Sequence, residues 1–370
     1  MTALQTIPVF RPPMISNLAA DLVSCLESRW WGYGPRCAAL EQRFTARRSG
    51  WALATSSCTA ALNIAAQLVR RTDSDEVIVP AITFVSTAMA FHIAGMRPVV
   101  VDVNPDTLLL NVESVERYLT SHTRAIVAVH LYGQRQDLSK LRTLCDRHNL
   151  TLIEDCAHRI GNLAEEPVGD FACYSFNAVK EAPAGEGGLI WARDAQLEPA
   201  ARAVSYLGMT VDTFQRSSTS LHREYEFGGG SGAKLRLTDV AATLVLANLD
   251  HVHDWRARRS TIFARYEADL PMALADVSFC RRLSTDSYLM FVIRVPRAKR
   301  ATIRHALANF GIASSTHYTS LSRHPLWSHN AAPCPVAEAA ENELLTLPCF
   351  PDLDCKAQDR VISAWTAAWQ

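Results

Sequence analysis

The stretch TLIEDCAHRIGNLAEEPVGDFACYSFNAVKEAPAGEGGLIWA, residues 151–192, decides the fold of this chain. It contains three short apolar segments, at 151–156, 172–176 and 188–192. Their nearly continuous hydrophobicity and β-branched side chains are typical of strands that are buried on both faces of a sheet. We therefore expect a buried sheet at the centre of the fold.

Three further candidate strands precede this stretch, at 76–80, 98–103 and 125–130. Residues 86–95 and 138–150, between them, carry helical spacing. This alternation predicts an α/β fold with a mainly parallel central sheet and helices on both of its faces. In such sheets ligands bind at the carboxyl ends of the strands.

The second part of the chain changes character after a loop-like region at 207–233. A long helical stretch starts near Thr238 and ends before Pro271. We interpret its basic part, 256–259, as a solvated helix face rather than a nucleic-acid contact. A strand at 289–295 and a helix at 299–310 follow, and then another apolar segment after Gly311.

This order predicts two packed domains, which is the usual arrangement for a chain of 370 residues. We place a large domain with an N-terminal arm at 1–250, and a smaller C-terminal α/β domain at 251–370. The 37 basic and 37 acidic side chains give no net charge, which argues against a protein that coats nucleic acid.

The first twenty residues do not have the pattern of a signal peptide, and no apolar run approaches the roughly 18 residues that cross a bilayer. The ten cysteines form no C-x-x-C pair and no zinc-type spacing, so we interpret them as small buried hydrophobes. We expect a reduced, cytoplasmic protein with no metal, membrane or nucleic-acid partner.

Two strand ends carry residues that indicate chemistry. Asp155 lies at the end of the strand at 151–156, and Lys180 follows the strand at 172–176. A lysine between buried strands can lose its charge and act as an amine nucleophile. Alone, Asp155 could equally cap a helix or form a salt bridge.

Together, the acid and the lysine are what a pyridoxal phosphate enzyme requires. The lysine forms a Schiff base with the cofactor, and the acid keeps the pyridine nitrogen protonated so that the ring accepts electrons. Residues 55–68, TSSCTAALNIAAQL, would bind the phosphate at a helix N-terminus. A simple N-cap by Ser56 or Ser57 would explain the same residues.

Ten motifs follow one another along the chain: RWWGYGP, SSCTAAL, DEVIVPAITFVSTA, PVVVDVNPDTL, TRAIVAVHLYGQ, IEDCAHRIG, YSFNAVK with GEGG, GAKLRLTD, GIASSTHY and LLTLPCFPDL. In this order they make the chain resemble the DegT/StrS family of sugar aminotransferases, which are fold-type-I pyridoxal phosphate enzymes. The chain looks closest to the branch that aminates a 4-keto pentose on a nucleotide in lipid A modification.

The resemblance implies a role for each of several residues around the cofactor ring. Lys180 would hold the cofactor as a Schiff base and move the proton during the reaction. Asp155 would pair with the pyridine nitrogen, His158 would contact the phenolic oxygen, and Phe84 would stack on the ring.

The resemblance also implies how the cofactor's phosphate is bound. Cys58, Thr59 and Ser175 would bind it, with Cys58 using its backbone N–H where relatives have glycine or alanine. Lys234 would reach the phosphate from the neighbouring subunit, which implies a homodimer with shared active sites.

Several positions depart from the family pattern near the expected substrate mouth. Tyr33 stands where relatives often have threonine, Arg159 where alanine is commoner, and Ser322 where many have a second histidine. Tyr33, Arg159, His317 and Tyr318 are our candidate substrate residues, although His317 could equally be a packed core histidine.

The expected reaction transfers an amino group from an amino acid, with glutamate as the expected donor, to a keto sugar that is nucleotide-linked. The alternatives are a cyclitol or another keto metabolite as acceptor, a pyridoxal reaction other than transamination, and a non-catalytic, regulatory member of the fold. The regulatory alternative predicts loss of Lys180 or Asp155, and both are present.

Overall fold

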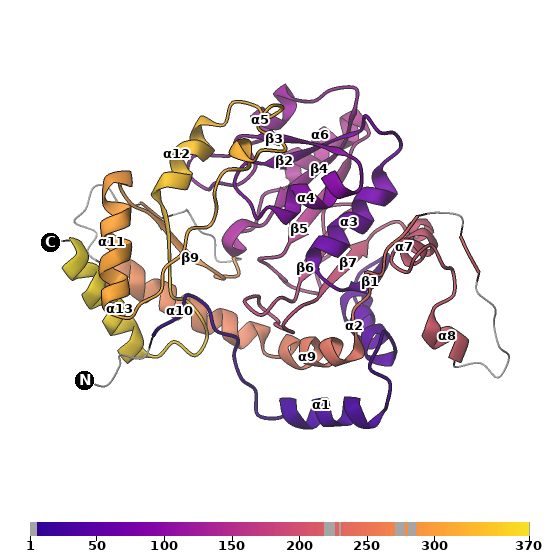
Figure 1. Cartoon of the computed structure of the whole chain (residues 1–370), viewed down its shortest axis with the longest axis horizontal. Coiled ribbons are helices and arrows are strands. Elements are labelled where there is room, and N and C mark those ends of the chain that lie inside the picture. Colours follow the sequence, from indigo (N-terminus) through magenta and orange to yellow (C-terminus); the bar gives the residue numbers. More distant parts are fainter. Residues whose placement is uncertain (1–5, 218–225, 229–230, 271–277, 280–285, 370) are drawn as a thin grey trace.

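The six predicted strands of the central sheet and one further strand form a seven-stranded sheet in the computed structural model, in the order β1-β7-β6-β5-β4-β2-β3 (Figure 1). The structure describes residues 6–217, 226–228, 231–270, 278–279 and 286–369. Only β7 runs against its neighbours, since it pairs antiparallel with both β6 and β1 while the other pairs are parallel. The expected mainly parallel sheet is therefore confirmed. The strands are β1 (Trp51–Thr55), β2 (Glu76–Pro80), β3 (Arg97–Val101), β4 (Thr123–Val129), β5 (Thr151–Cys156), β6 (Phe171–Ser175) and β7 (Gly188–Ala192).

Six of the seven strands lie where the sequence predicts them, and β2, β5 and β7 have the predicted bounds. The sequence analysis missed β1, whose five residues WALAT are short and rich in alanine. In the structure β1 pairs with β7 in register from Trp51 opposite Ala192 to Thr55 opposite Gly188. Both faces of β1 are covered, because Leu53 and Ala54 pack into different hydrophobic clusters.

Helices cover both faces of the sheet, as predicted. One face packs against α3 (Cys58–Val69) and α4 (Ser86–Ile93), and the opposite face against α2 (Pro35–Thr45), α6 (Ser139–His148) and α9 (Asp239–Leu249). The remaining helices on the N-terminal side are α1 (Leu18–Glu27), α5 (Val112–Arg117), α7 (Glu198–Val204) and α8 (Thr213–Ser217), with short 3-10 turns at Leu131–Gly133 and Ala195–Leu197.

A second hydrophobic core lies beside the large sheet, on the left of Figure 1. It contains side chains of α10, of the strand pair β9 and β10, and of α11 and α13, and Ile7 of the N-terminal arm joins it. Its three-stranded sheet is antiparallel. The elements are α10 (Val252–Asp269), β8 (Ser278–Phe279), β9 (Phe291–Arg294), α11 (Arg297–Asn309), a 3-10 turn at Leu321–Arg323, α12 (Pro335–Glu343), β10 (Leu344–Leu347) and α13 (Cys355–Trp369).

The boundary between these two units is less simple than a cut after residue 250. Trp327 and, on α12, Ala337 and Ala340 pack into the core of the large sheet, although they lie far beyond that position. The apolar segment after Gly311 forms only isolated bridges, from Ile312 to Ile7 and from Ser315 to Thr346. The division at residue 250 stays a prediction.

The long helical stretch is two helices, which corrects one expectation. Thr238 caps the start of α9, because its side chain accepts the backbone N–H of Ala241 at 3.2 Å. The helical conformation is interrupted at Asp250 and His251, and α10 begins at Val252. The interpretation of 256–259 as a solvated face is wrong for Arg259, which is buried close to Glu181, whereas Ala257 is exposed and Arg256 and Arg258 are half-buried.

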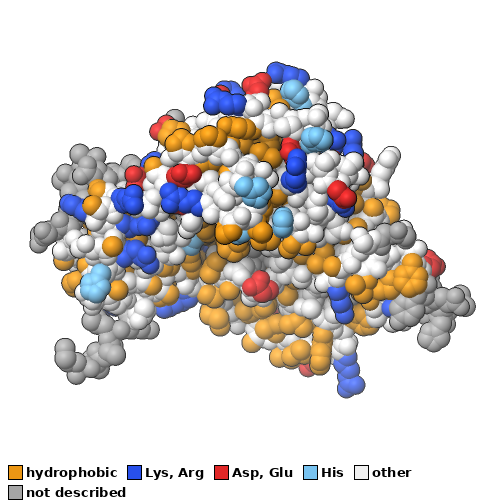
Figure 2. All heavy atoms as spheres, turned by 45° about the horizontal axis from the view of Figure 1, so that its top comes forward, with side chains coloured by type: hydrophobic (Ala, Val, Ile, Leu, Met, Phe, Trp, Pro, Cys, Tyr) orange, Lys and Arg blue, Asp and Glu red, His pale blue; other side chains and the backbone are white. Residues whose placement is uncertain are grey.

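The loop-like region at 207–233 contains α8 and the isolated bridge from Met209 to Phe227, and a second bridge, from Tyr206 to Lys234, joins the residues that flank it. Residues 218–225 and 229–230 of this region lie outside the described residues. Eight of the nine described cysteines are buried, as expected, and Cys355 is exposed. Figure 2 shows basic and acidic side chains interspersed over one face of the described molecule.

Within the described ranges, no helix is both long enough and apolar enough to span a bilayer.

Candidate active site

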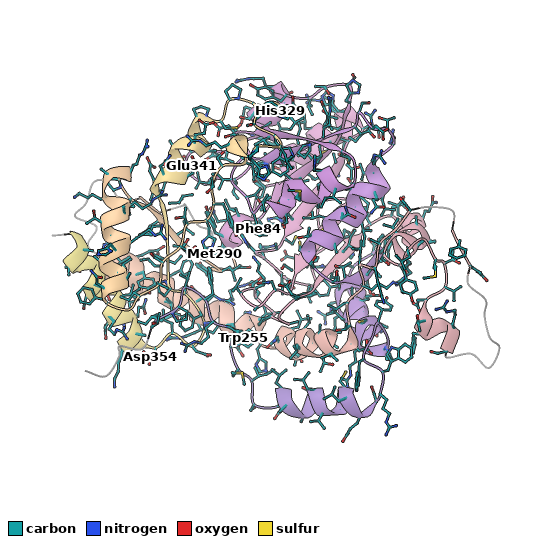
Figure 3. The ribbon with its side chains drawn as sticks, viewed as in Figure 1. Phe84, Trp255, Met290, His329, Glu341 and Asp354 are labelled. Atoms are coloured by element: carbon teal, nitrogen blue, oxygen red, sulfur yellow. The ribbon has the colours of Figure 1, made fainter. Side chains whose placement is uncertain are left out.

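The carboxyl ends of β4, β5 and β6 open on a cavity of about 380 Å³. The start of α3, the turn before α4 and residues 317–318 complete its wall. Figure 3 places Phe84 and Met290, which both line the cavity, near the centre of the molecule. Nine of the twelve predicted site residues line this cavity: Cys58, Thr59, Phe84, Asp155, His158, Ser175, Lys180, His317 and Tyr318.

Lys180 lies in the loop between β6 and β7, where its side chain lines the cavity. Within the described part of the chain its Nζ has no hydrogen-bond or ion-pair partner. Burial lowers the pKa of Lys180 to about 8, although the charge of Asp155 opposes this shift. The other four lysines of the chain are exposed. Lys180 is therefore the lysine with the character of a nucleophilic amine.

Asp155, near the end of β5, is buried at the bottom of the same cavity. Its Oδ2 accepts a hydrogen bond from the Thr87 hydroxyl at 2.7 Å, and its Oδ1 accepts one from the Ala157 backbone N–H at 3.0 Å. Burial raises the pKa of Asp155, and these hydrogen bonds and the charge of Lys180 oppose the rise only in part. A buried carboxylate with this environment would be stabilised by a cationic ring nitrogen.

The N-terminus of α3 faces the cavity and has the features of an anion site. Cys58 and Thr59 are its first two residues, whose backbone N–H groups have no partner within a helix. The N-cap alternative is present as well, since the Ser57 side chain accepts the N–H of Ala60 at 3.1 Å. A Cβ on Gly188 would lie 2.3 Å from the carbonyl carbon of Ser57, so only glycine lets β7 approach this turn.

The Cys58 side chain points away from the helix end toward the sheet. Its Sγ lies 3.8 Å from Asp155 Oδ1 and 3.5 Å from the Cys173 carbonyl oxygen. Burial raises the pKa of this thiol well above its usual value. The side chain of Cys58 therefore lies on the sheet side of the helix end. This fits the expectation that a cysteine can replace glycine or alanine here because only its backbone N–H is used.

His158 and Tyr318 form one wall of the cavity. The Tyr132 backbone N–H donates to His158 Nδ1 at 3.0 Å, so the proton of the neutral ring is on Nε2, which lies 3.1 Å from the Tyr318 hydroxyl. Burial holds the pKa of His158 well below its usual range, which keeps the ring neutral. Phe84, a large aromatic side chain that is 54% exposed, lies beside Tyr318 with ring centroids 5.9 Å apart.

The sequence left open whether His317 is a substrate residue or a packed core histidine, and the structure shows features of both. It lines the cavity, yet its Nδ1 is 2.8 Å from the Thr346 hydroxyl and its carbonyl accepts a hydrogen bond from the Tyr132 hydroxyl. Burial lowers its pKa to about 4, so the ring is neutral at pH 7.

The structure does not bring Tyr33 or Lys234 to this cavity. Both line a second hollow, of about 460 Å³, together with Trp30, Trp31 and Arg236. The Tyr33 hydroxyl donates to Glu41 at 2.6 Å and accepts from Arg202 at 2.9 Å. Within its own chain Tyr33 is therefore held in a buried polar network rather than at the substrate mouth. Ser322 is likewise buried and donates to Glu338 at 3.0 Å.

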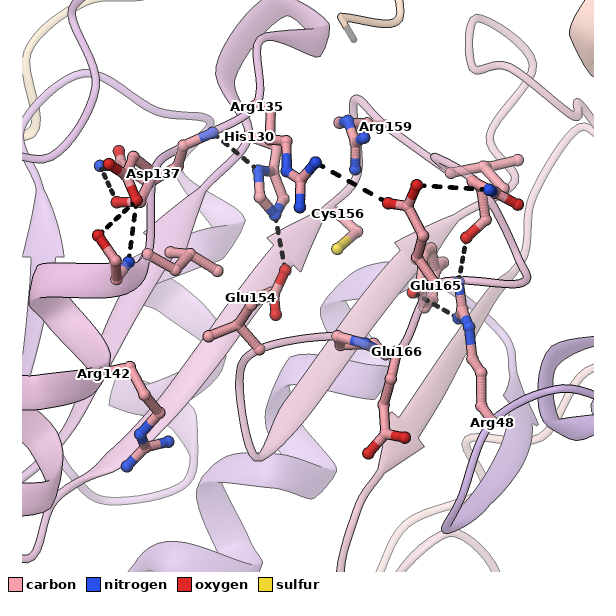
Figure 4. Close-up of a pocket in the computed structure, with 18 residues that line it drawn as sticks. Arg48, His130, Arg135, Asp137, Arg142, Glu154, Cys156, Arg159, Glu165 and Glu166 are labelled. Carbon is pink, nitrogen blue, oxygen red and sulfur yellow. Dashed lines mark hydrogen bonds and ion pairs between the residues drawn. The ribbon is translucent and has the colours of Figure 1, made fainter.

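Arg159 also lies elsewhere, in a third hollow on the other face of β5 (Figure 4). The loop after the strand turns its side chain to the side of Glu154 and Cys156. The expectation that Arg159 lines the mouth near Lys180 is not met within one chain, because the turn after β5 directs its side chain into this third hollow.

This third hollow contains His130, Glu154 and Cys156, whose potential ligand atoms lie within 4.8 Å of one another. The two ring nitrogens of His130 are nevertheless in use. Nδ1 accepts the backbone N–H of Gln136 at 3.1 Å, so Nε2 carries the proton that faces Glu154 at 2.8 Å (Figure 4). A ring with this hydrogen bond at Nδ1 cannot offer Nε2 to a metal without becoming an imidazolate.

The sequence analysis missed several residues that line the cavity or touch Asp155. Thr87 follows Phe84 by three positions in ITFVSTA, a motif that was noted only for the aromatic ring. Asn177 lies in SFNAVK, and its side chain donates to Glu186 at 2.8 Å. Phe10, from the N-terminal arm, had no sequence signal, because only the folded path of the arm brings it to the cavity.

A lysine without a partner among the described residues, a buried acid and a helix N-terminus share one cavity at the carboxyl edge of a mainly parallel sheet. This arrangement fits a pyridoxal phosphate enzyme, since it offers an amine, a partner for the ring nitrogen and a phosphate site. Residues 13–366 match the DegT/DnrJ/EryC1/StrS aminotransferase family. The chain belongs to this family, and it is an aminotransferase whose cofactor is pyridoxal phosphate.

Solved structures agree with this assignment over nearly the whole chain. The aminotransferase TlmJ from Streptoalloteichus hindustanus is 28% identical, with a TM-score of 0.88, 98% of this chain covered and 99% of that one. DesV from S. venezuelae, in complex with a ketimine intermediate, is 27% identical, with a TM-score of 0.83, 97% of this chain covered and 99% of that one. A putative sugar aminotransferase, Spr1654 from Streptococcus pneumoniae, is 25% identical, with a TM-score of 0.87, 98% of this chain covered and 97% of that one.

Proposed function

We propose that the protein transfers an amino group from glutamate to the keto group of a nucleotide-linked sugar. The observation that carries the proposal is that Lys180 and Asp155 line one cavity with the N-terminus of α3. The family supplies the reaction class, and the similarity to the putative sugar aminotransferase Spr1654 supports a sugar as the acceptor.

The residues of the cavity have distinct roles in this proposal. Pyridoxal phosphate, when bound, stabilises negative charge on the substrate carbon next to the nitrogen. Asp155 would hold the proton on the pyridine nitrogen, Phe84 would pack on the ring, and His158 would donate its Nε2 proton to the phenolic oxygen. The phosphate would be bound by the backbone N–H groups of Cys58 and Thr59 and by the Ser175 hydroxyl.

Lys180 has two tasks, to link the cofactor and to move a proton. With substrate bound, the Nζ amine of Lys180 would be the base that takes the proton from the substrate carbon next to the nitrogen, and the same amine, once protonated, would be the acid that gives it back. A pKa of about 8 suits both directions, because the amine is readily protonated and deprotonated near neutral pH.

We also propose a homodimer in which Lys234 reaches the phosphate of the partner's cofactor. This proposal is supported by the exposure of Lys234 and by its place in a hollow of the same chain other than that of Lys180. Mixing Lys180→Ala subunits with Lys234→Ala subunits tests it, since a heterodimer would have one site with both lesions and one with neither. Recovered activity supports a shared site, and a verified heterodimer without recovery rules it out.

The reaction itself is tested in two half-reactions. The enzyme is incubated with glutamate, the pyridoxamine phosphate form is isolated, and keto acceptors are screened for return of the visible Schiff-base absorption. A nucleotide-linked 4-keto or 3-keto sugar is expected to restore it faster than the free sugar or a keto-cyclitol. If glutamate, glutamine, alanine and aspartate all fail to produce the pyridoxamine form, transamination of these donors is excluded.

A further inference from the structure

The turn that begins α4 does more than present Phe84 to the cavity. The Thr87 hydroxyl donates to Asp155 Oδ2 at 2.7 Å, which leaves the Thr87 oxygen to accept a hydrogen bond from the Thr83 hydroxyl at 2.9 Å. The Thr87 backbone N–H donates to the Phe84 carbonyl at 3.1 Å. One turn therefore connects the aromatic ring over the cavity with the acid at its bottom.

These hydroxyl groups are out of contact with solvent. Thr87 is fully buried and Thr83 is 2% exposed, so neither can exchange its partner for water. A hydrogen bond to an ionised carboxylate in such surroundings is stronger than one between neutral groups. The Cys58 thiol reaches the other carboxylate oxygen, but at 3.8 Å and as a weak donor.

We infer that Thr87, supported by Thr83, is a positioning residue that keeps Asp155 ionised and aimed at the pyridine nitrogen. The inference rests on the proposed role of Asp155 as the partner of that nitrogen. It assigns a task to a hydroxyl that touches neither substrate nor cofactor. Cys58 makes a smaller contribution of the same kind.

The physical reason lies in a competition for one proton between the carboxylate and the ring nitrogen. Burial favours the protonated, neutral carboxyl group, and the Thr87 hydroxyl favours the ionised one. Without that hydroxyl, the shared proton moves from the ring nitrogen toward Asp155, and the ring stabilises negative charge less well. The other titratable groups of the described chain that interact electrostatically with Asp155 are Lys180, Cys58, Cys173 and Tyr318, and, from the other face of β5, Cys156 and His130.

The test compares Thr87→Val with Thr87→Ser in the holoenzyme reconstituted with ¹⁵N-labelled pyridoxal phosphate. Valine keeps the shape of threonine and removes the hydroxyl, whereas serine keeps the hydroxyl. The ¹⁵N NMR shift of the ring nitrogen is expected to move toward that of an unprotonated pyridine in Thr87→Val and to stay at the wild-type position in Thr87→Ser. For Thr87→Val, kcat should fall about ten- to a hundredfold, as expected for one hydrogen bond to a charged group, while KM for glutamate stays within about twofold.

Three further variants grade the effect and separate the possible failures. Thr83→Val, which removes only the support of Thr87, should give a smaller shift in the same direction, and Cys58→Ala a smaller one still. Asp155→Asn is the reference, since it removes the carboxylate itself. A wild-type ¹⁵N shift in Thr87→Val, with a changed shift in Asp155→Asn, would overturn the inference alone. Wild-type shifts in both variants would overturn the role of Asp155 as well.

Discussion

Glu154 and Asp155 are neighbours on one strand, yet their surroundings change the pKa of each in opposite directions. Burial alone would raise the pKa of Glu154, but hydrogen bonds from His130 at 2.8 Å and from the Gly169 N–H at 2.6 Å outweigh it and lower that pKa. For Asp155, the hydrogen bonds from Thr87 and from the Ala157 N–H do not outweigh burial, which raises its pKa. The side chains on the two faces of β5 therefore have different roles. Glu154 is satisfied within the protein, and Asp155 needs a cationic partner.

The same contrast holds for the two hollows beside the strand. The hollow of Glu154 contains arginines that are paired with acids, such as Arg142 with Asp170 at 3.0 Å. The cavity of Asp155 contains an amine and a helix N-terminus without partners in the described chain. Cavity size therefore does not identify the active site, since the hollow of Glu154 is the larger, at about 610 Å³. The active site is identified instead by reactive groups that have no hydrogen-bond or ion-pair partner among the described residues.

Replacement of Lys180 gives the largest expected effect. Lys180→Ala should abolish the visible Schiff-base absorption and lower the rate of amino transfer by on the order of 10⁴-fold or more, because both the link and the proton carrier are lost. The fold should be retained, as circular dichroism would show. Lys140→Ala, which changes an exposed lysine on α6, is the control and should behave as wild type.

The neighbouring acids should respond in different assays. Asp155→Asn should slow the half-reaction with glutamate by on the order of 10²- to 10⁴-fold, since the ring nitrogen loses its charged partner. Glu154→Gln should keep nearly full activity per folded molecule but lose about 1–3 kcal/mol of stability, because its amide N–H₂ cannot accept the hydrogen bonds of Glu154. Equal losses of rate in the two variants would contradict the division between the two faces.

Stability against pH in the cofactor-free protein sharpens this comparison. Because folding raises the pKa of Asp155, ionisation of this carboxyl group lowers the free energy of unfolding. The loss of stability is absent below the pKa in the unfolded chain, about 3.9, and grows as the pH rises through the pKa in the folded protein. Asp155→Asn should therefore raise the melting temperature at pH 7 and not at pH 3.5. The lowered pKa of Glu154 contributes stability that is present above about pH 4.3 and is lost as the pH falls through the folded value, so Glu154→Gln should melt earlier at pH 7.

The depressed pKa of Lys180 predicts how fast the cofactor is taken up. The rate of reconstitution from the cofactor-free protein should rise about tenfold per pH unit up to about pH 8 and then level, because only the neutral amine attacks the aldehyde. Absorption spectroscopy in stopped flow measures it. A midpoint near the usual lysine value of about 10.4 would show that burial does not tune this amine.

Replacement of Arg159 gives the smallest expected effect on activity. Since its side chain lies in the hollow of Glu154, Arg159→Ala should leave kcat and KM for both substrates within about twofold. A large increase in the KM of the keto acceptor would instead place Arg159 at the substrate mouth, as its sequence position first suggested.

The sequence predicts the sheet well and the faces of its strands poorly. Continuous apolar runs identify β2, β5 and β7, but a run that is buried on both sides does not say which face each residue takes. The family resemblance of IEDCAHR placed His158 and Arg159 in one site, and only the folded turn after β5 separates them. Lys180 and Asp155 could be predicted because few chemistries need that pair. Thr87 could not, because a buried hydroxyl leaves no pattern in one sequence.

The most direct test of the central assignment is to reduce the holoenzyme with borohydride and locate the modified residue by peptide mass spectrometry. Borohydride fixes the Schiff base, so that the lysine which holds the cofactor keeps its mass increment through digestion. The account predicts that the increment is found on Lys180, within the peptide that contains Asn177 and Glu181. An increment on Lys234 or on any of the other three lysines, with Lys180 unmodified, would contradict it.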